Sequence, residues 1–473
     1  MSDNEIMKRY FSFRDDVLNK VSPTFCSAKW LQSSIYLWNG HTHSCHHPVQ
    51  HKVSLEDIKK NPKALHNSPK KIQARQEMLN GVQTSECNYC WNIENLADDH
   101  LSDRTYKSFD EWSKPSIPEV IKDGLGENIN PTYLEIGFEN SCNLKCSYCS
   151  PDVSSRWMEE IQSKGPYTLS QYNMHDLDYL KQIGKFPIHR DDPNPYADAF
   201  WEWWPDLYKS LKVFRITGGE PLLSRHVWKV LDYIAENPRE DLDFAINTNL
   251  CVPQKQIEKL VEFANKTHKK IKSFNIYTSL ESTGPQAEYV RFGLNYNTFL
   301  QNVNFVLSNT PDEVRVNFMT TINILSTSSF SNFLQDILEL RAKYSSNKEE
   351  HRFNLNRVPL MFSYLRWPHF LSIKNLPLEL KSKFSQEWRN FVKNNLFGVS
   401  SKNTMGLFYQ EEEDQMARLC DFMLTNEDNL KLNMIDFYLF HQQYDERRNV
   451  KFKEVFPELA EFYDECKNAW SSK

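Results

Sequence analysis

Between about residues 133 and 360, short apolar segments alternate with helical stretches. The apolar segments are rich in Val, Ile, Phe and Tyr, and they predict strands at 133–138, 212–217, 243–248, 273–280, 314–322 and 352–358. Helices are predicted between them at 225–236, 253–266, 286–307 and 330–344. This alternation predicts an α/β fold with a parallel sheet and right-handed crossovers.

The chain before these strands has a different pattern. Asn39 and Gly40 stand between two β-like arms, which is a strong hairpin signal. A helix is predicted to follow, with Ser68 as its N-cap, Pro69 in its first turn and Gly81 as its stop.

Two further regions complete the predicted organisation. A long insertion at about 156–211 separates the first two strands, and its Trp-rich segment 200–205 indicates a helix packed on the sheet more than a substrate lid. After about residue 371 the pattern is helical and polar, with helices at 376–394 and 457–470. We therefore expect three parts: an N-terminal hairpin and helix domain at 1–115, a central α/β domain at 130–370 and a helical C-terminal region at 371–473.

Composition narrows the possible functions. The 473 residues are 40% hydrophobic and carry a net charge of -6, which suits a folded protein and makes nucleic acid an unlikely partner. No run of 18 apolar residues predicts a membrane span, and the acidic first residues lack a signal sequence, so a cytoplasmic protein is expected. In that compartment the ten cysteines are expected to bind metal more than to form disulfides.

Three of these cysteines form a compact C-x3-C-x2-C run, Cys142, Cys146 and Cys149, directly after the first predicted strand. Three thiolates on one loop can hold three irons of a cubane cluster. The fourth iron then stays open to bind and activate another molecule, whereas a fourth cysteine would close the cluster for electron transfer alone.

This spacing, with Tyr148 just before the last cysteine, resembles the signature of the radical S-adenosylmethionine (SAM) enzymes. About 70 residues later, the segment from Ile216 to Leu222 resembles the GGE segment of that family. The resemblance implies a partial (β/α)6 TIM-like barrel, which six strands suit. In such barrels the chemistry lies at the carboxyl ends of the strands, where both motifs are expected.

The resemblance also implies the chemistry and the residues that carry it. Cys142, Cys146 and Cys149 would ligate a [4Fe-4S] cluster whose open iron chelates SAM. One electron, from a donor such as flavodoxin or ferredoxin, would cleave SAM to methionine and a 5′-deoxyadenosyl radical that abstracts hydrogen from substrate. The implied SAM contacts are Tyr148 at the adenine, Gly218, Gly219 and Glu220 at the amino group, Asn249 and Ser279 at the ribose, and Arg291 at the carboxylate. Surface ions at Glu220 and Arg291, and a turn at Asn249, remain alternatives.

A second group of cysteines lies in the first hundred residues: Cys26, Cys45, Cys87 and Cys90. The predicted hairpin would bring Cys26 and Cys45 together, and the C-x2-C pair lets two thiolates bind one centre. The hairpin spacing resembles the opening of the SPASM domain and its shorter twitch form, although that family usually carries the module after the barrel. The resemblance implies a closed auxiliary [4Fe-4S] cluster that passes electrons. A structural zinc site with four cysteine ligands is the competing interpretation.

Histidines and a basic stretch also lie near the second cysteine group in the sequence. The histidines around Cys45 are expected to be partly solvated, although one of them could replace a cysteine ligand; they are His41, His43, His46 and His47. The basic stretch is expected to form a solvated helix surface, or to meet an acidic leader peptide or a phosphate; it comprises Lys59, Lys60, Lys63, Lys70, Lys71 and Arg75.

For the substrate, the resemblance places a peptide or protein side chain slightly ahead of a small metabolite or nucleotide. The rival class is an iron-sulfur or zinc scaffold without catalytic activity. The GGE segment argues against a scaffold, since a scaffold does not need to bind SAM.

Overall fold

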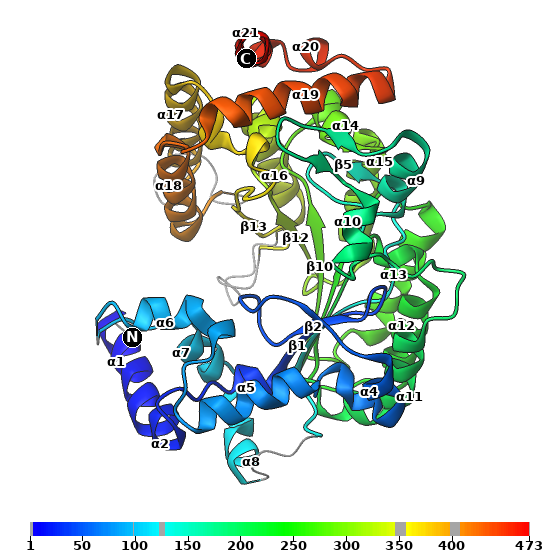
Figure 1. Ribbon diagram of the computed structural model, residues 1–473, viewed down its shortest axis with the longest axis vertical. Helices are drawn as coiled ribbons and strands as arrows, with labels where there is room; N and C mark the ends of the chain where they lie inside the picture. The colour runs from blue at the N-terminus through cyan, green and yellow to red at the C-terminus, as the bar shows by residue number, and fades with distance from the viewer. Residues whose placement is uncertain (1–2, 98, 123–127, 346–355, 398–406, 473) are drawn as a thin grey trace. The chain divides into compact units, whose positions relative to one another are not determined.

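The computed structural model describes residues 3–97, 99–122, 128–345, 356–397 and 407–472 (Figure 1). The chain forms two compact units, which are described separately. The first unit contains Met1–Asn140, Gly184–Pro221 and Arg239–Ala245. The second contains Ser141–Ile183, Leu222–Pro238 and Ile246–Lys473.

The strands of the first unit combine parallel and antiparallel pairing. The parallel strands β4 (Tyr133–Gly137) and β8 (Val213–Thr217) confirm the first two predicted strands. β1 (Gln32–Tyr36) pairs parallel to β4 on its other edge, and β2 (His41–His43) and β3 (His51–Lys52) continue antiparallel from it. The sequence pattern did not predict the parallel pairing of β1 with β4.

The predicted hairpin between β1 and β2 is confirmed, with its turn at Gly40. The Gly40 N–H donates to the Tyr36 carbonyl at 2.8 Å, and its φ of +73° favours glycine. A Cβ atom there would lie 2.1 Å from the ring of Tyr196. The hairpin therefore depends on glycine for its conformation and for its packing.

The described part of the first unit also contains a set of helices. They are α1 (Asp3–Phe13), α2 (Asn19–Val21), α3 (Ala28–Leu31), α4 (Leu55–Lys60), α5 (Pro69–Leu79), α6 (Asn88–Glu94), α7 (Asp103–Phe109), α8 (Ile117–Lys122) and α11 (Pro195–Ser210). In α11, the Phe200 ring lies 5.1 Å from the Phe138 ring, and the Trp204 ring 5.4 Å from the Phe214 ring. The Trp-rich segment thus packs against residues at the ends of β4 and β8, as expected of a core helix.

The burial of α5 corrects one expectation. Ser68 caps this helix as predicted, accepting from the Lys71 N–H, and Figure 1 shows the helix beside the β1–β2 hairpin. Lys59, Lys60 and Lys70 are exposed, but Lys71 and Arg75 are only 1% and 4% exposed. Their positions share one helical face with Ala74 and Met78, and that face is buried.

The second unit contains a parallel set of strands: β10 (Ser273–Ser279) pairs with β12 (Arg315–Met319), and β12 with β13 (Leu360–Met361). β9 (Asp243–Asn247) falls at the chain boundary between the units. The strand predicted at 352–358 lies partly outside the described residues, and the strand observed nearby is β13. The α/β class is confirmed, while the six-stranded partial barrel stays a prediction.

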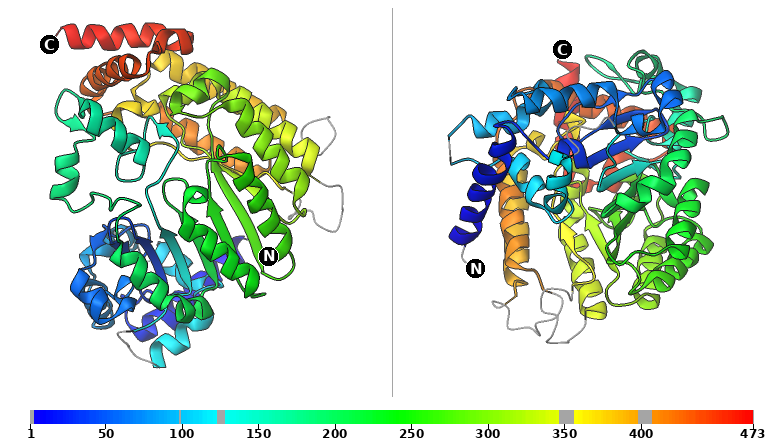
Figure 2. Two further views of the ribbon diagram at one scale, coloured as in Figure 1. Left: turned by 90° about the vertical axis from the view of Figure 1, so that its right-hand side faces the viewer. Right: turned by 90° about the horizontal axis from the view of Figure 1, so that it is seen from below.

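Helices α12 (Arg225–Glu236), α13 (Gln254–Thr267), α15 (Tyr296–Asn309) and α16 (Phe330–Tyr344) form a row in the second unit (Figure 2). The single helix predicted at 286–307 is wrong. α14 (Gly284–Val290) ends at β11 (Arg291–Phe292), and α15 begins only after Gly293, whose φ is +103°. β11 pairs antiparallel with β5 (Lys145–Cys146).

The remaining elements of the second unit are mainly helical. They are α9 (Ser155–Lys164), β6 (Tyr167–Thr168), β7 (Asn173–Met174), α10 (Leu177–Gln182), α17 (Leu378–Asn394), α18 (Gln410–Leu424), α19 (Leu430–Arg448), α20 (Phe452–Val455) and α21 (Ala460–Ser471). α17 packs beside α18, and α19 beside α21 (Figures 1 and 2). Among the described residues, no helix combines the length and apolar character that a membrane span needs.

Candidate cofactor site

The loop of Cys142, Cys146 and Cys149 is held at several points within the second unit. The Cys142 N–H donates to Ser155 Oγ of α9 at 3.1 Å, and the Cys149 N–H donates to the Cys146 carbonyl at 2.9 Å. Trp157 Nε1 donates to the same carbonyl at 2.9 Å. The loop is therefore positioned by α9 and by its own turn.

Arg291 lies beside the middle cysteine. It stands opposite Cys146 in the β5–β11 pair, and its Nη1 lies 3.8 Å from Cys146 Sγ. Its Nη2 donates to Glu281 Oε2 at 2.7 Å and to the Tyr148 hydroxyl. Tyr148 in turn donates to Glu281 Oε1 at 3.0 Å. Two predicted SAM contacts, Tyr148 and Arg291, are thus brought together with a predicted ligand.

The burial and charge of Arg291 and Glu281 indicate how they could bind a cofactor. Arg291 and Glu281 are 4% and 0% exposed, so their ion pair is withdrawn from water. The Nε of Arg291 is buried and has no hydrogen-bond partner. A buried donor of this kind normally has an acceptor, and a carboxylate is the acceptor that a guanidinium fits best. The Nε of Arg291 is therefore a donor that an anionic group would satisfy.

Two of the three thiols, those of Cys146 and Cys149, have raised pKa values. Burial raises the pKa of Cys149 well above its usual value, and the charges of Cys146 and Cys142 raise it further. Burial also raises the pKa of Cys146, although the charge of Arg291 opposes this. Thiols with raised pKa values are poor free nucleophiles, and a bound metal centre is what would stabilise them as thiolates. The donor set fits an iron-sulfur cluster.

The predicted ribose contacts lie at strand ends of the second unit. Asn249 Nδ2 donates to Asn143 Oδ1 on the cysteine loop at 2.8 Å, and Asn249 Oδ1 accepts from the Cys251 N–H at 2.8 Å. Ser279 ends β10, opposite Met319 of β12. Asn249 therefore connects to the cysteine loop, while Ser279 is placed only by its strand.

Gly293 is a site residue that the motif analysis missed. Its φ is +103°, and a Cβ atom there would lie 2.9 Å from the Asn143 carbonyl of the cysteine loop. Only glycine allows the chain after β11 to approach that loop so closely. Its signal in the sequence was the isolated glycine inside a predicted helix.

Replacing Gly293 by Ala should destabilise the protein through both strain and overlap. The positive φ costs about 1–3 kcal/mol for a non-glycine residue, and the overlap adds about 1–3 kcal/mol. Gly165→Ala is the control, because Gly165 has a φ of +78° but no atom within 4 Å of its Cβ position. Urea unfolding of both variants should show the larger loss in Gly293→Ala; equal losses would mean that the overlap is relieved.

A buried carboxylate supports the same loop from α9. Glu160 pairs with Lys145 at 2.7 Å and with Arg448 at 2.9 Å, and it accepts from the Tyr167 hydroxyl at 2.6 Å. Lys145 lies between the first two predicted ligands. The network therefore joins the cysteine loop to the end of α19 through one carboxylate.

The GGE segment follows β8 in the first unit. Gly218 has a φ of +132°, and a Cβ atom there would lie 3.0 Å from the Glu139 carbonyl. The Gly219 N–H donates to the same carbonyl at 3.3 Å. Glu220 is 1% exposed, so it is not a surface ion. The segment has the close backbone approach that its glycines predict.

The second cysteine group gathers within the first unit. Burial raises the pKa of Cys26 to about 12, and the charges of Cys90, Cys87 and Cys45 contribute to the rise. Cys87 and Cys90 are 8% and 7% exposed and belong to the apolar core of this unit. They lie in a short helical turn that continues into α6. The four thiols are therefore close enough to act on one another.

The histidines near Cys45 already have partners. His41 Nδ1 contacts Asn39 Oδ1 at 3.1 Å, and His43 Nε2 contacts the Tyr36 hydroxyl at 3.2 Å. His47 Nε2 contacts Asp103 at 2.8 Å. His41 and His43 are buried, contrary to the expectation of partly solvated side chains. Their burial within the β1–β2 hairpin accounts for the difference.

In the part of the chain that the structure describes, no three His, Cys, Asp or Glu side chains form a ready-made group for one metal ion.

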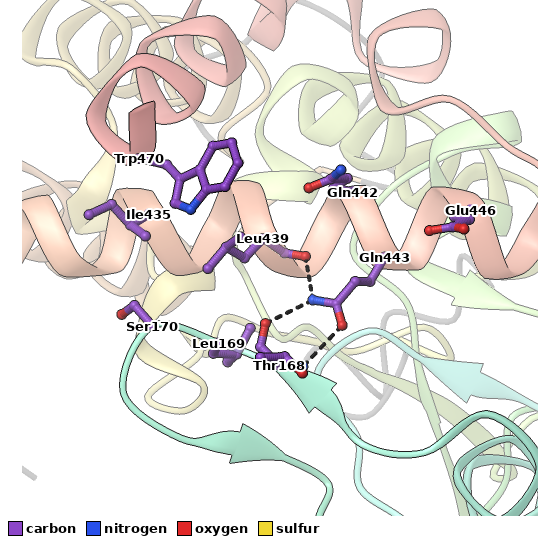
Figure 3. Close-up of a pocket in the computed structure, with 9 residues that line it drawn as sticks. All are labelled: Thr168, Leu169, Ser170, Ile435, Leu439, Gln442, Gln443, Glu446 and Trp470. Atoms are coloured by element: carbon purple, nitrogen blue, oxygen red, sulfur yellow. Dashed lines mark hydrogen bonds between the residues drawn. The ribbon is translucent and has the colours of Figure 1, made fainter. Parts of the chain in front are cut away.

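A groove of about 410 Å³ lies between β6, α19 and Trp470 (Figure 3). Gln443 crosses it, donating to the Thr168 carbonyl at 2.9 Å. Its lining residues are none of the predicted cofactor residues, so it is a separate surface feature.

Comparison with known proteins gives partial matches. No protein-family model matches the chain. The GTP 3′,8-cyclase of Syntrophomonas wolfei is 29% identical over 122 residues, which cover 26% of this chain and 27% of that enzyme. The GTP 3′,8-cyclase of Aliarcobacter butzleri is 26% identical over 145 residues, covering 30% and 33%. The chain thus spans about a quarter to a third of the length of these curated relatives.

Together with the cysteine loop, this similarity supports assignment of the chain to the radical SAM superfamily of enzymes. Among solved structures, Streptococcus suis SuiB bound to S-adenosylmethionine aligns with 80% of this chain and 71% of its own, at 11% identity and a TM-score of 0.32. A TM-score this low carries no argument about the fold, so the fold description rests on the geometry of this chain alone.

Proposed function

We propose that this protein binds a [4Fe-4S] cluster and SAM and carries out radical chemistry on a substrate. Cys142, Cys146 and Cys149 would hold the cluster. The observation that carries the proposal is the contact of Arg291 with Cys146 at 3.8 Å, since it sets a buried guanidinium with an unpartnered Nε beside the partly buried middle thiol of the cysteine loop. When bound, the cluster and SAM would supply a 5′-deoxyadenosyl radical that removes hydrogen from the substrate.

The residues of the site have distinct parts in this proposal. Arg291 would bind the SAM carboxylate, and Glu281 would hold Arg291 and Tyr148 in place through the two hydrogen bonds it accepts. Tyr148 would lie by the adenine. The remaining SAM contacts are proposed at Gly218, Gly219, Glu220, Asn249 and Ser279. Burial of the Arg291–Glu281 ion pair would help to keep water from the radical.

The first experiment is anaerobic reconstitution of the purified chain with iron and sulfide, followed by SAM and dithionite. The proposal predicts methionine and 5′-deoxyadenosine in equal amounts, quantified by chromatography. A reconstituted protein with the cluster that leaves SAM intact would contradict it. A colourless protein that retains zinc alone would support the scaffold alternative.

For the substrate we infer a peptide or protein side chain, with a nucleotide as the second candidate. The peptide comes first from the sequence resemblance. The nucleotide is kept as the second candidate because the names of the relatives, GTP 3′,8-cyclases, contain a nucleotide. Transfer of deuterium from a labelled substrate into 5′-deoxyadenosine distinguishes the two. Label from deuterated GTP would establish the nucleotide and exclude the peptide as the required hydrogen source. The electron donor is proposed to be a flavodoxin or ferredoxin.

We further propose that Cys26, Cys45, Cys87 and Cys90 hold an auxiliary [4Fe-4S] cluster. Four thiolates would close such a centre, so its part would be electron transfer. A structural zinc ion uses the same ligands and remains the alternative.

Replacing both Cys87 and Cys90 by Ala should lower the iron content of the reconstituted protein from about eight to about four per chain. Iron assays and mass spectrometry under native conditions measure this. If the iron content is unchanged and one zinc ion is lost, the four cysteines are assigned to a zinc site and the proposal of an auxiliary cluster is wrong.

A further inference from the structure

Three basic side chains are buried in the first unit, which also contains the four cysteines. Lys29, Lys71 and Arg75 are 2%, 1% and 4% exposed. Long cationic side chains are almost never this buried unless an anion accompanies them. The anions near these three side chains therefore show how far their charges are balanced.

Lys29 is linked to the cysteines through Glu86. Its Nζ lies 2.8 Å from Glu86 Oε2, and Glu86 immediately precedes Cys87. Burial opposes the charged form of Lys29, but the charges of Cys87 and Glu86 outweigh burial and raise its pKa. The Lys29 N–H also donates to the Cys26 carbonyl at 3.0 Å, so Lys29 is a buried cation beside the cysteine group.

Lys71 lacks a carboxylate partner. Its Nζ donates to Ser33 Oγ at 2.9 Å and to Thr42 Oγ1 at 2.8 Å, and none of the described carboxylates lies within ion-pair distance of it. Burial lowers its pKa well below the usual value, and the neighbouring charges of Arg75 and Lys29 add to this, while Glu86 and Cys45 oppose it. Hydroxyl partners alone do not offset the desolvation of an ammonium group.

Glu86 cannot balance these charges by itself. It already pairs with Lys29 and, at 3.1 Å, with Lys70. Arg75 is a further basic side chain whose charge no carboxylate balances. It donates to two neutral acceptors, the Lys29 carbonyl at 3.1 Å and Asn67 Oδ1 at 2.7 Å. The described carboxylates thus leave Lys71 and Arg75 without an ion-pair partner.

We propose that Lys29 and Lys71 are buried counter-cations of the four-cysteine centre and raise its reduction potential. The inference rests on the auxiliary cluster proposed above. Four thiolates around a dicationic core leave about two negative charges on the centre, which would complete the charge balance that Glu86 leaves unfinished. Reduction adds another negative charge, and nearby cations favour it.

The test is a redox titration of the reconstituted full-length protein, followed by electron paramagnetic resonance, for wild type, Lys71→Met and Lys29→Met. Met replaces the lysine stem with a side chain of similar length and no charge. Lys59→Met is the matched control, because Lys59 is exposed in the same unit. The proposal predicts a negative shift of the auxiliary midpoint potential in Lys71→Met and Lys29→Met, none in Lys59→Met, and an unchanged potential for the other cluster.

The outcomes separate the two proposals. Equal auxiliary potentials in all four proteins, each with both clusters at full iron content, would overturn the counter-cation assignment and leave the auxiliary cluster intact. A wild-type protein that binds only the cluster of Cys142, Cys146 and Cys149 would overturn both. If Lys71→Met does not fold, Lys29→Met supplies the measurement, since the two lysines lie on different elements.

Discussion

Replacing Cys146 by Ala should abolish formation of 5′-deoxyadenosine and remove about four irons per chain. Cys146 is the middle predicted ligand, and it is the thiol that Arg291 contacts at 3.8 Å. Two remaining cysteines would not retain a cluster whose assembly needs three. The auxiliary iron of the first unit should be unaffected, because its cysteines belong to a different group.

Cys420→Ala is the matched control for this experiment. Cys420 is buried on α18 with Sγ 3.8 Å from the Ser385 carbonyl, away from both cysteine groups in the sequence. This variant should keep full iron content and full production of 5′-deoxyadenosine. A Cys146→Ala protein that retains both would show that the C-x3-C-x2-C run does not hold the cofactor.

Replacing Arg291 by Met should have the second large effect, on stability and on SAM binding together. It leaves the carboxylate of Glu281, which is 0% exposed, without its cation, and breaking such a pair costs about 3–5 kcal/mol. It also removes the proposed partner of the SAM carboxylate. Urea unfolding measures the first loss, and equilibrium binding of SAM measures the second.

Two variants separate these effects. Arg341 forms another buried pair in the second unit, with Nη1 3.0 Å from Glu412 Oε2, so Arg341→Met should lose similar stability without weakening SAM binding. Adding Glu281→Met to Arg291→Met should restore part of the stability, because the unpaired charge is removed, but not the binding. Equal SAM affinity in Arg291→Met and wild type would remove Arg291 from the proposed site.

Local patterns predicted much of the fold. Strands β4, β8, β9 and β10 were predicted to within one residue at each end, because each is a short apolar segment with turns on both sides. β12 was also predicted, but it ends three residues earlier than expected. The hairpin at Gly40 was also predicted, because its turn signal is local. The parallel pairing of β1 with β4 was not, since it joins segments about 100 residues apart and no local pattern encodes it.

Three misses have definite physical causes. Lys71 and Arg75 were assigned to solvent because of their charge, although they occupy the same helical face as Ala74 and Met78. Arg291 was placed inside a long helix, whereas Gly293 ends that helical pattern and lets Arg291 pair with Cys146. Glu281, which holds Arg291 and Tyr148, was not among the predicted site residues, because its role depends on contacts made in three dimensions.

The central claim is that one iron stays open for SAM. The most direct measurement is electron paramagnetic resonance of the dithionite-reduced protein with Cys87 and Cys90 replaced by Ala, before and after SAM is added. The account predicts a single cluster signal whose g values change with SAM, because SAM binds the open iron. A cluster signal that is identical with and without saturating SAM would contradict it.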